Sequence, residues 1–217
     1  MILATNRLIL RPWCEDDAEE LYKYASDPDV GPPAGWPTHK SVEHSREIIR
    51  TALSMPETYA VCLKSDGKPI GSIGFHRRDL ATSDDEYELG YWIAKKYWGQ
   101  GLIPEASREM LRYAFEDLHM NRIWCAYYDG NEKSHRVQEK LGFVYYRTTE
   151  GVDVPLLGET RTGHSNLMTR ERWQKVNLFR QQKELLDTFI EKGAITQAQY
   201  NKSLADLIRL MEMQGVE

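Results

Sequence analysis

The sequence predicts an α+β fold that carries a helical appendage at its C-terminal end. Strand-like runs rich in aromatic and β-branched residues alternate with stretches whose apolar residues recur every three to four positions, which indicates strands and amphipathic helices. Residues 178–211 contain helical stripes only. The 217 residues suffice for one good-sized domain and a smaller attached element.

The first part of the chain is expected to place two helices before a strand-rich segment. Pro12 ends the first strand, Ser41 is expected to cap the second helix, and Asp66-Gly67 is typical of a hairpin turn. The expected elements are a strand at 7–11, a helix at 15–27, an irregular loop at 31–37, a helix at 41–53, strands at 59–64 and 69–76, a polar loop at 80–85 and a strand at 86–93.

The second part is expected to alternate helices and strands before the appendage begins. Asn131 is a helix N-cap candidate, Gly142 suits the C′ position, and Thr196 with Gln199 fits a capping box. The expected elements are a helix at 104–118, a strand at 123–128, a helix at 132–141, a strand at 143–147, a loop at 151–163, a strand at 166–168, a segment at 170–176, and a helical hairpin whose two helices meet near Gly193.

The apolar stripe of this hairpin needs a surface to cover it, because two helices alone bury little. We favour a second copy of the chain or another partner over packing on the main domain.

A strand-to-helix turn with two glycines, Gly99 and Gly101, follows the strand at 86–93. Glycine lets a ligand approach the backbone, and the unpaired N–H groups of a helix N-terminus suit a phosphate or pyrophosphate. The Walker A pattern is absent, and Pro104 occupies the place of the third glycine of a dinucleotide fingerprint. From these residues alone, the turn is either an anion site or ordinary chain geometry.

Composition narrows the function classes. The formal net charge is -5 and no basic stripe is visible, which disfavours nucleic acid as the main ligand. Cys14, Cys62 and Cys125 lack metal or redox spacing, so we expect free thiols in a reducing compartment. We see no signal peptide, membrane-spanning run or metal cluster, and we expect a cytoplasmic protein without a membrane partner.

The order of elements resembles the GNAT N-acetyltransferases, and two motifs carry the resemblance. Tyr97-Trp98-Gly99-Gln100-Gly101 with Glu105-Ala106 is similar to the acetyl-CoA pyrophosphate loop of that superfamily, and residues 131–143 are similar to its second signature. Residues 5–11 and 170–173 resemble the RimJ/RimL branch, the ribosomal-protein-alanine acetyltransferase type. The superfamily loop usually opens with Gln or Arg three residues before the first glycine, where this chain has Lys96.

The resemblance implies a GNAT domain at residues 1–175, with a mixed, mostly antiparallel central sheet flanked by helices. The hairpin at 176–217 is similar to short SHOCT-type modules, which implies oligomerisation, for example a homodimer, or partner contact. Acetyl-CoA is the implied cosubstrate, no metal is implied, and the acceptor is an amine on a small molecule or peptide.

The resemblance also implies roles for individual residues. The strand residues Tyr91, Trp92 and Ile93, the turn residues Trp98, Gly99, Gln100, Gly101 and Leu102, and Asn131 would bind acetyl-CoA. A backbone N–H near Tyr91 or Trp92 would meet the developing oxyanion. Glu88 is the candidate base, with Glu86 on the same strand face as the runner-up; the alternative for Glu88 is a solvated strand carboxylate.

Ser134 is the candidate acid, although its place in the first helical turn equally suits helix capping. Tyr128 and His135 are weaker candidates for the acid, and His76 and His164 are expected to be structural or on the surface. The loop around Trp36, the loop after His76 and residues 156–164 would line the acceptor side.

Three functions remain in view. The first is acetyl-CoA-dependent N-acetylation of a primary amine, which includes a protein N-terminal α-amine. The second is a CoA-binding regulatory or adaptor module without turnover, which would bind a partner through the hairpin. The third, a nucleotide-binding protein of another fold, is disfavoured by Pro104 and by the missing Gly-Lys-Ser/Thr. Glu88 and Ser134 beside both signatures favour the enzyme.

Overall fold

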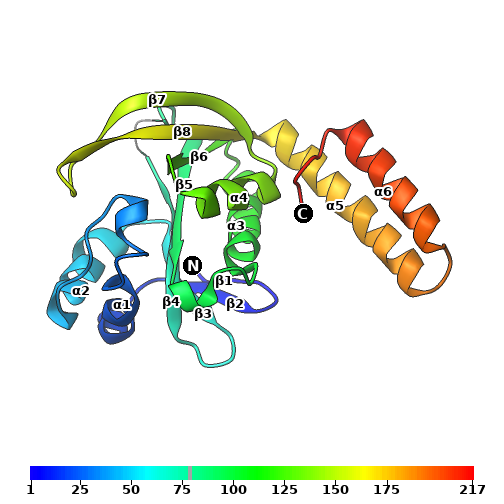
Figure 1. The fold of residues 1–217 in the computed structure, drawn as a ribbon. Coiled ribbons are helices and arrows are strands. Elements are labelled where there is room, and N and C mark those ends of the chain that lie inside the picture. Colours follow the sequence, from blue (N-terminus) through cyan, green and yellow to red (C-terminus); the bar gives the residue numbers. More distant parts are fainter. Residues whose placement is uncertain (78–79) are drawn as a thin grey trace.

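The computed structural model describes residues 1–77 and 80–217, and in these ranges eight strands form one sheet (Figure 1). The strands follow the order β1-β2-β3-β4-β5-β6-β8-β7, and every neighbouring pair is antiparallel except β5 and β6. This confirms the expected mixed, mostly antiparallel sheet. The strands are β1 (Leu3–Ala4), β2 (Leu8–Arg11), β3 (Thr58–Leu63), β4 (Pro69–His76), β5 (Glu86–Ile93), β6 (Arg122–Tyr128), β7 (Val144–Val154) and β8 (Glu159–Thr169).

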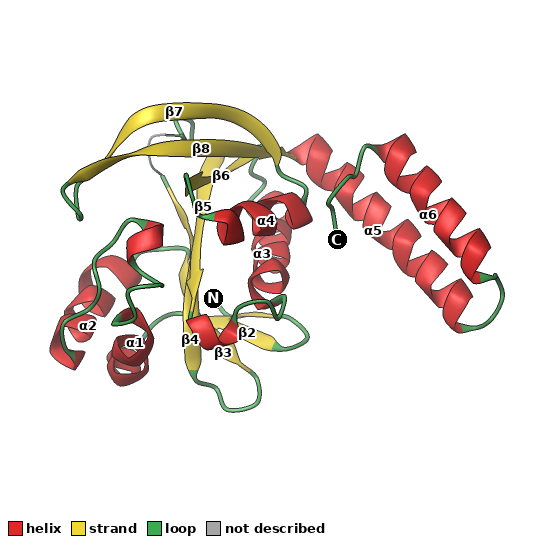
Figure 2. Ribbon diagram, in the orientation of Figure 1, coloured by secondary structure: helices red, strands yellow, loops and turns green. Residues whose placement is uncertain are grey.

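Helices cover both faces of this sheet and extend beyond it (Figure 2). α1 and α2 lie on one face, and α3 and α4 lie on the other. The larger apolar core joins the sheet to α3, and a smaller core joins it to α1. The helices are α1 (Ala18–Ala25), α2 (Val42–Ile48), α3 (Leu102–Arg112), α4 (Glu132–Leu141), α5 (Arg170–Glu191) and α6 (Gln197–Met211).

The helix termini follow the signals in the sequence. The Ser41 side chain accepts a hydrogen bond at the start of α2, and Asn131 does so at the start of α4. Gly142 ends α4 with φ of 91°, a left-handed conformation that costs glycine little. Thr196 and Gln199 form the expected capping box of α6. These caps depend on residues a few positions apart, so local sequence predicts them.

Two stretches expected to be irregular have regular structure. Much of the loop expected at 151–163 belongs to the β7–β8 hairpin, whose turn spans only residues 155–158. Most of β7 is exposed on both faces, so it lacks the alternation of buried and exposed residues that marks a strand. Within 31–37, Pro32–Ala34 form a short 3₁₀ helix, because prolines fit the first positions of a helix.

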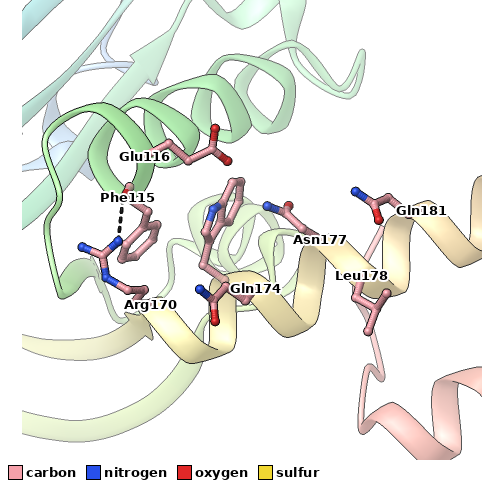
Figure 3. A pocket seen from close by; sticks show the side chains of 8 residues that line it. Phe115, Glu116, Arg170, Gln174, Asn177, Leu178 and Gln181 are labelled. Atoms are coloured by element: carbon pink, nitrogen blue, oxygen red, sulfur yellow. Dashed lines mark hydrogen bonds between the residues drawn. The ribbon is translucent and has the colours of Figure 1, made fainter.

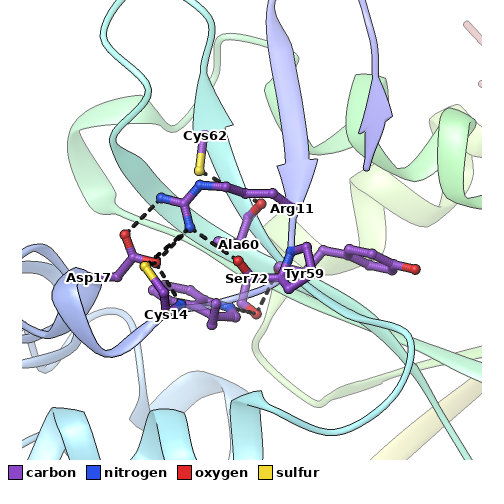
Figure 4. A network of polar contacts seen from close by, with 9 residues as sticks. Arg11, Cys14, Asp17, Tyr59, Ala60, Cys62 and Ser72 are labelled. Carbon is purple, nitrogen blue, oxygen red and sulfur yellow. Dashed lines mark hydrogen bonds and ion pairs between the residues drawn. The ribbon is translucent and has the colours of Figure 1, made fainter. Parts of the chain in front are cut away.

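A polar network fixes β2 to the start of α1 (Figure 4). Arg11 donates two hydrogen bonds of 2.7 Å to the carboxylate of Asp17, which lies just before α1. Trp13 Nε1 donates to Ser72 Oγ of β4 at 3.1 Å, and that hydroxyl donates to Tyr59 O of β3 at 3.2 Å. The network therefore connects α1 to three neighbouring strands.

The C-terminal helices form the expected hairpin, which projects from the sheet (Figure 1). α5 is one continuous helix, so the expected domain boundary at residue 175 falls inside it. Contact of the hairpin with a second copy stays a prediction, as does its likeness to SHOCT modules. In the described part of the chain, no helix is long and apolar enough to cross a membrane.

Candidate active site

The central feature is an opening between the two parallel strands. β5 pairs with β4 as far as Ile93, but it pairs with β6 only from Glu86–Arg122 to Glu88–Trp124. β6 continues to pair with β8 as far as Tyr128. Beyond Glu88 the two strands therefore separate, and one edge of β5 has no neighbouring strand among the described residues.

The peptide groups of β5 alternate between β4 and this opening, as they do along any strand paired on one side. Cys125 Sγ of β6 donates to Leu89 O at 3.3 Å, so the peptide group of Leu89 faces the opening. Ala94 N donates to Ile70 O at 2.9 Å, so even-numbered positions face β4. By this alternation the N–H of Tyr91 points into the opening and that of Trp92 points away from it.

The side chains of β5 alternate between the two faces of the sheet, as the sequence predicts. Leu89 and Ile93 are buried in the core that contains α3. Trp92 lies on the opposite face, where its ring centroid is 6.5 Å from that of Trp13 and 5.7 Å from that of Trp36. Trp92 therefore belongs to the α1 side of the sheet rather than to the side of α3 and α4.

Glu86 and Glu88 lie on the same face but in different surroundings. Glu86 is 3% exposed, and it accepts hydrogen bonds from Arg122 at 2.8 Å and Trp124 at 3.0 Å. Burial alone raises the pKa of Glu86, but these hydrogen bonds outweigh burial and hold the pKa below its usual value. Glu88 is half-buried opposite His76 of β4, at the last pair before β5 and β6 separate.

The glycine turn lies where β5 leads into α3. Gly99 and Gly101 have φ of 75° and 72°, so both need the conformational freedom of glycine. Gln100 donates its side-chain N–H to Lys96 O at 3.0 Å, which closes the turn. Within the described residues, the backbone N–H groups of Gly99, Gln100, Gly101 and Leu102 donate to no recorded acceptor. These four donors and the positive end of α3 can hold an anion.

Two residues near the turn were not expected as functional residues. Arg7 Nη1 donates to Gln100 O at 3.0 Å, and Arg7 Nε pairs with Glu105 of α3 at 2.6 Å. Lys133 of α4 places its ammonium 4.0 Å from the ring centroid of Trp98, a cation–π contact that brings positive charge to the turn. Arg7 and Glu105 each lie in a stretch that resembles the family, and their contact joins positions 98 residues apart.

The N-terminal end of α4 meets β5 through a chain of polar contacts. Tyr91 Oη lies 3.1 Å from Ser134 Oγ, which also accepts from Gln138 Nε2 at 3.2 Å. Asn131 Oδ1 accepts from Ser134 N, and Asn131 Nδ2 donates to Pro33 O, both at 3.2 Å. An amide can form further hydrogen bonds beyond these two, so Asn131 retains capacity for a ligand. Burial raises the pKa of the Tyr91 phenol well above its usual value, so the phenol stays protonated.

The other histidine and tyrosine candidates have structural contacts. The ring of Tyr127 stacks on both His135 and His164, with centroid distances of 4.8 Å in each case. Tyr128 packs under Gly35, where an added Cβ would lie 3.0 Å from its ring. Among the described residues no group of His, Cys, Asp and Glu side chains is arranged to hold a metal ion. Of the proposed acceptor-side segments, residues 78–79 lie outside the described chain.

The cysteines are free thiols within the described chain. Burial raises the pKa of Cys62 to about 11, and burial together with the Glu88 carboxylate raises that of Cys125. Cys14 is exposed, but desolvation and its contact with Asp17 raise its pKa as well. A thiolate nucleophile is therefore disfavoured at all three positions.

The cavities recorded along α5 lie away from this opening. One of about 280 Å³ lies beside the end of the α3 segment, where Arg170 donates to Phe115 O at 2.7 Å (Figure 3). Another of about 380 Å³ lies between α3 and α5 and is lined by Glu105, Arg108 and Arg180, among others. The opening between β5 and β6 leads to several backbone N–H donors. It is therefore a better candidate for the active site than either cavity.

Known proteins match the chain in sequence and fold. Residues 7–144 match the family model described as the acetyltransferase (GNAT) domain. The chain is 32% identical over 186 residues to the FsC-acetyl coenzyme A-N(2)-transacetylase of Aspergillus fumigatus, which covers 80% of this chain and 78% of that protein. It is 28% identical over 140 residues to the ribosomal protein uS5-alanine N-acetyltransferase of Escherichia coli, covering 64% of this chain and 65% of the relative.

A solved structure supports the fold assignment. The acetyltransferase (GNAT family) from Bacillus anthracis superposes with a TM-score of 0.70 at 24% identity, over 79% of this chain and 99% of that one. The family match covers more than half of the chain and includes β5, the glycine turn and α4. The chain belongs to the GNAT family of acetyltransferases, which transfer an acetyl group from acetyl-CoA.

Proposed function

We propose that this acetyltransferase acts on a primary amine, with a protein N-terminal α-amine as the first candidate, and that the amine attacks the thioester directly. The observation that carries the proposal is the opening that begins at Glu88 and leads to the glycine turn. A carboxylate, backbone N–H donors and an anion site then follow one another along a single strand and its turn. The E. coli relative, named for the alanine of ribosomal protein uS5, supports the choice of acceptor.

The turn and α4 hold the donor substrate in this proposal. Acetyl-CoA supplies the acetyl group as an activated thioester. The N–H groups of Gly99, Gln100, Gly101 and Leu102 hold its pyrophosphate, and Lys133 adds positive charge beside them. The amide of Asn131 uses its remaining hydrogen-bonding capacity for the pantetheine arm.

Tyr91 and Ser134 act on the reacting end of the thioester. The N–H of Tyr91 faces the opening and stabilises negative charge on the acetyl oxygen, and one such donor is worth about 10²–10³ in rate. The hydroxyl of Ser134 donates a hydrogen bond to the departing sulfur, which leaves as a thiolate and takes its proton from water. Ser134 lies in the first turn of α4, where the helix dipole also favours a thiolate.

Glu88 accepts the proton of the attacking ammonium, directly or through water. Amines are mostly protonated at neutral pH, so a base at the opening contributes typically about 10²–10⁴ in rate. Glu86 is less suited, because Arg122 and Trp124 hold its carboxylate in the charged form and away from the opening. Position and environment therefore favour Glu88 over its neighbour.

The test measures amine-dependent release of CoA thiol from acetyl-CoA with N-terminal peptides, polyamines and aminoglycosides as acceptors. With an accepted amine we expect Glu88→Gln to lower kcat about 10²-fold near neutral pH, with little change in the KM for acetyl-CoA. The matched variant Glu86→Gln should mainly lower stability. Equal kcat values for Glu88→Gln and Glu86→Gln would show that Glu88 is not the base. Acetyl-CoA binding without turnover on any amine class would favour the regulatory or adaptor module instead.

A further inference from the structure

The C-terminal end of α4 is held by residues of the hairpin, which lies beyond the matched domain. The last carbonyl groups of a helix have no partner within the helix, so they need other donors. Arg180 Nη2 donates to Lys140 O at 3.3 Å and to Leu141 O at 3.4 Å, and Arg172 Nε donates to Gly142 O at 3.1 Å. Two cations of α5 thus meet the negative end of the α4 dipole.

The residues that follow α6 return to the same place. Glu217 N donates to Lys140 O at 3.0 Å, and the Glu217 side chain pairs with Lys140 Nζ at 2.9 Å. Arg180 Nε donates to Glu217 O at 2.8 Å, so one guanidinium links the chain's last residues to α4. Arg180 of α5 therefore contacts both α4 and the segment after α6.

Apolar packing closes the same contact. Val176, Phe179, Met213 and Val216 form a buried cluster between α5 and the segment after α6. This cluster lies against the end of α4, since a Cβ built on Gly142 would be 2.7 Å from Val176 Cγ2 and 3.4 Å from Val216 Cγ2. There is no room for α4 to shift toward the hairpin without disturbing this cluster.

The opposite end of α4 belongs to the active site. The helix has ten residues and is about 15 Å long. A short helix moves largely as a unit, so the position of its C-terminal end sets that of Asn131 and Ser134. Buried Gln138 ties the middle of the helix to the sheet through Ala126 O at 3.3 Å and Asn166 at 2.7 Å. Contacts of Ser134 with Tyr91 and of Asn131 with Pro33 hold the N-terminal end of the helix, and the hairpin holds its C-terminal end.

We propose that Arg180 is a positioning residue of the acetyl-CoA site: by holding the C-terminal end of α4, it keeps Asn131 and Ser134 in register with β5. The hairpin is thereby an internal brace of the catalytic domain. The claim that Arg180 affects acetyl-CoA binding rests on the proposed function. The claim that Arg180 limits the motion of α4 is independent of it.

Arg180 keeps its charge although its buried surroundings disfavour it. Burial, with a contribution from Arg108, lowers the pKa of Arg180 to about 10, so the guanidinium is still charged at neutral pH. Its Nη1 is buried with no hydrogen-bond partner among the described residues. A lysine at this position keeps the charge, but its three donors are on one nitrogen instead of the guanidinium's five on three, so it can reach fewer of the separate carbonyl groups.

The test compares Arg180→Met and Arg180→Lys with the control Arg209→Met, all as full-length protein at a temperature well below the lowest melting temperature. Arg209 is an exposed cation of the same hairpin that pairs with Asp206 and makes no recorded contact with α4. We expect Arg180→Met to raise the KM for acetyl-CoA about fivefold to twentyfold through Asn131, and to lower kcat by a smaller factor through Ser134. Arg180→Lys should recover part of this loss, and Arg209→Met should match wild type.

Hydrogen exchange of the ligand-free proteins supplies the second measurement. The amides of residues 134–138 should exchange at least fivefold faster in Arg180→Met, while those of β3 and β4 should not change. If Arg180→Met does not fold, Val216→Ala loosens the same contact mildly and should show the same pattern at twofold to fourfold.

If amide hydrogen exchange and the KM for acetyl-CoA are unchanged in these folded variants, the proposal that the hairpin braces α4 is wrong. If wild-type protein neither binds nor turns over acetyl-CoA, the proposed function fails, while the exchange data still decide the role of Arg180.

Discussion

Gly142→Ala tests how tightly the hairpin packs on α4. Gly142 has φ of 91°, and an added Cβ would lie 2.7 Å from Val176 Cγ2. The left-handed conformation costs a residue with a Cβ about 1–2 kcal/mol, and overpacking a filled site costs about 1–3 kcal/mol. The alanine also restricts the unfolded chain, which returns about 0.4–1 kcal/mol. The expected loss in the free energy of unfolding is therefore about 1–4.6 kcal/mol.

Gly193→Ala is the matched control. Gly193 follows α5 with φ of 69°, and nothing lies within 4 Å of a Cβ built there. It shares the conformational cost without the clash, so we expect a loss of about 0–1.6 kcal/mol. Urea unfolding with comparable m-values measures the difference directly. In thermal unfolding each 1 kcal/mol corresponds to about 2–4 °C for a chain of this size.

Equal losses for the two variants would refute the close packing of Val176 on Gly142. A double variant combines Gly142→Ala with Val176→Ala, because Val176→Ala removes the methyl group that clashes. The double variant should be more stable than the sum of the single losses predicts, by at least about 1 kcal/mol. Strict additivity would show that the cost at Gly142 comes from the backbone alone.

Three further predictions concern single side chains. Glu105→Gln weakens its charge-assisted contacts with Thr5 and Arg7 and should lower the free energy of unfolding by about 1–3 kcal/mol in urea titrations. Tyr91→Phe keeps the backbone N–H and should lower kcat less than about fivefold, whereas a loss near 10²-fold would assign the chemistry to the phenol. Burial, with a smaller contribution from His44, lowers the pKa of His39 from 6.5 to about 4, so the unfolded chain takes up its proton first as the pH falls. The contribution of His39 to the free energy of unfolding should be fully present above pH 6.5 and should fall by about 1–2 kcal/mol toward pH 4, after allowance for solvent screening. The pH profile of stability should be flatter in His39→Gln.

Local signals predicted the parts of the site that depend on neighbouring residues. Asn131 caps a helix through the N–H of Ser134, three positions on, and Gly142 ends that helix, so the bounds of α4 were predictable. The two signatures predicted the family, and the alternation along β5 placed Glu88 and Tyr91 on opposite faces. These relations hold within one element or one turn.

Contacts between distant parts of the chain were not predictable in the same way. Arg7 and Glu105 are 98 positions apart, and neither stretch of sequence alone indicates which residue the other contacts. The separation of β5 from β6 after Glu88 is a property of pairing, which is invisible within one strand. The full length of the β7–β8 hairpin was missed because β7 is mostly exposed. The docking of α5 on α4 depends on backbone carbonyl groups, which every residue has.

The unbroken course of α5 has a consequence for anything attached to the end of the hairpin. The helix has 22 residues and a length of about 33 Å, and its first turns pack on the domain while its last turns extend outward. No flexible linker separates the two parts, so the tip near Gly193 keeps a fixed direction relative to the sheet. A fluorophore or fused peptide placed there would tumble with the whole molecule and report its orientation.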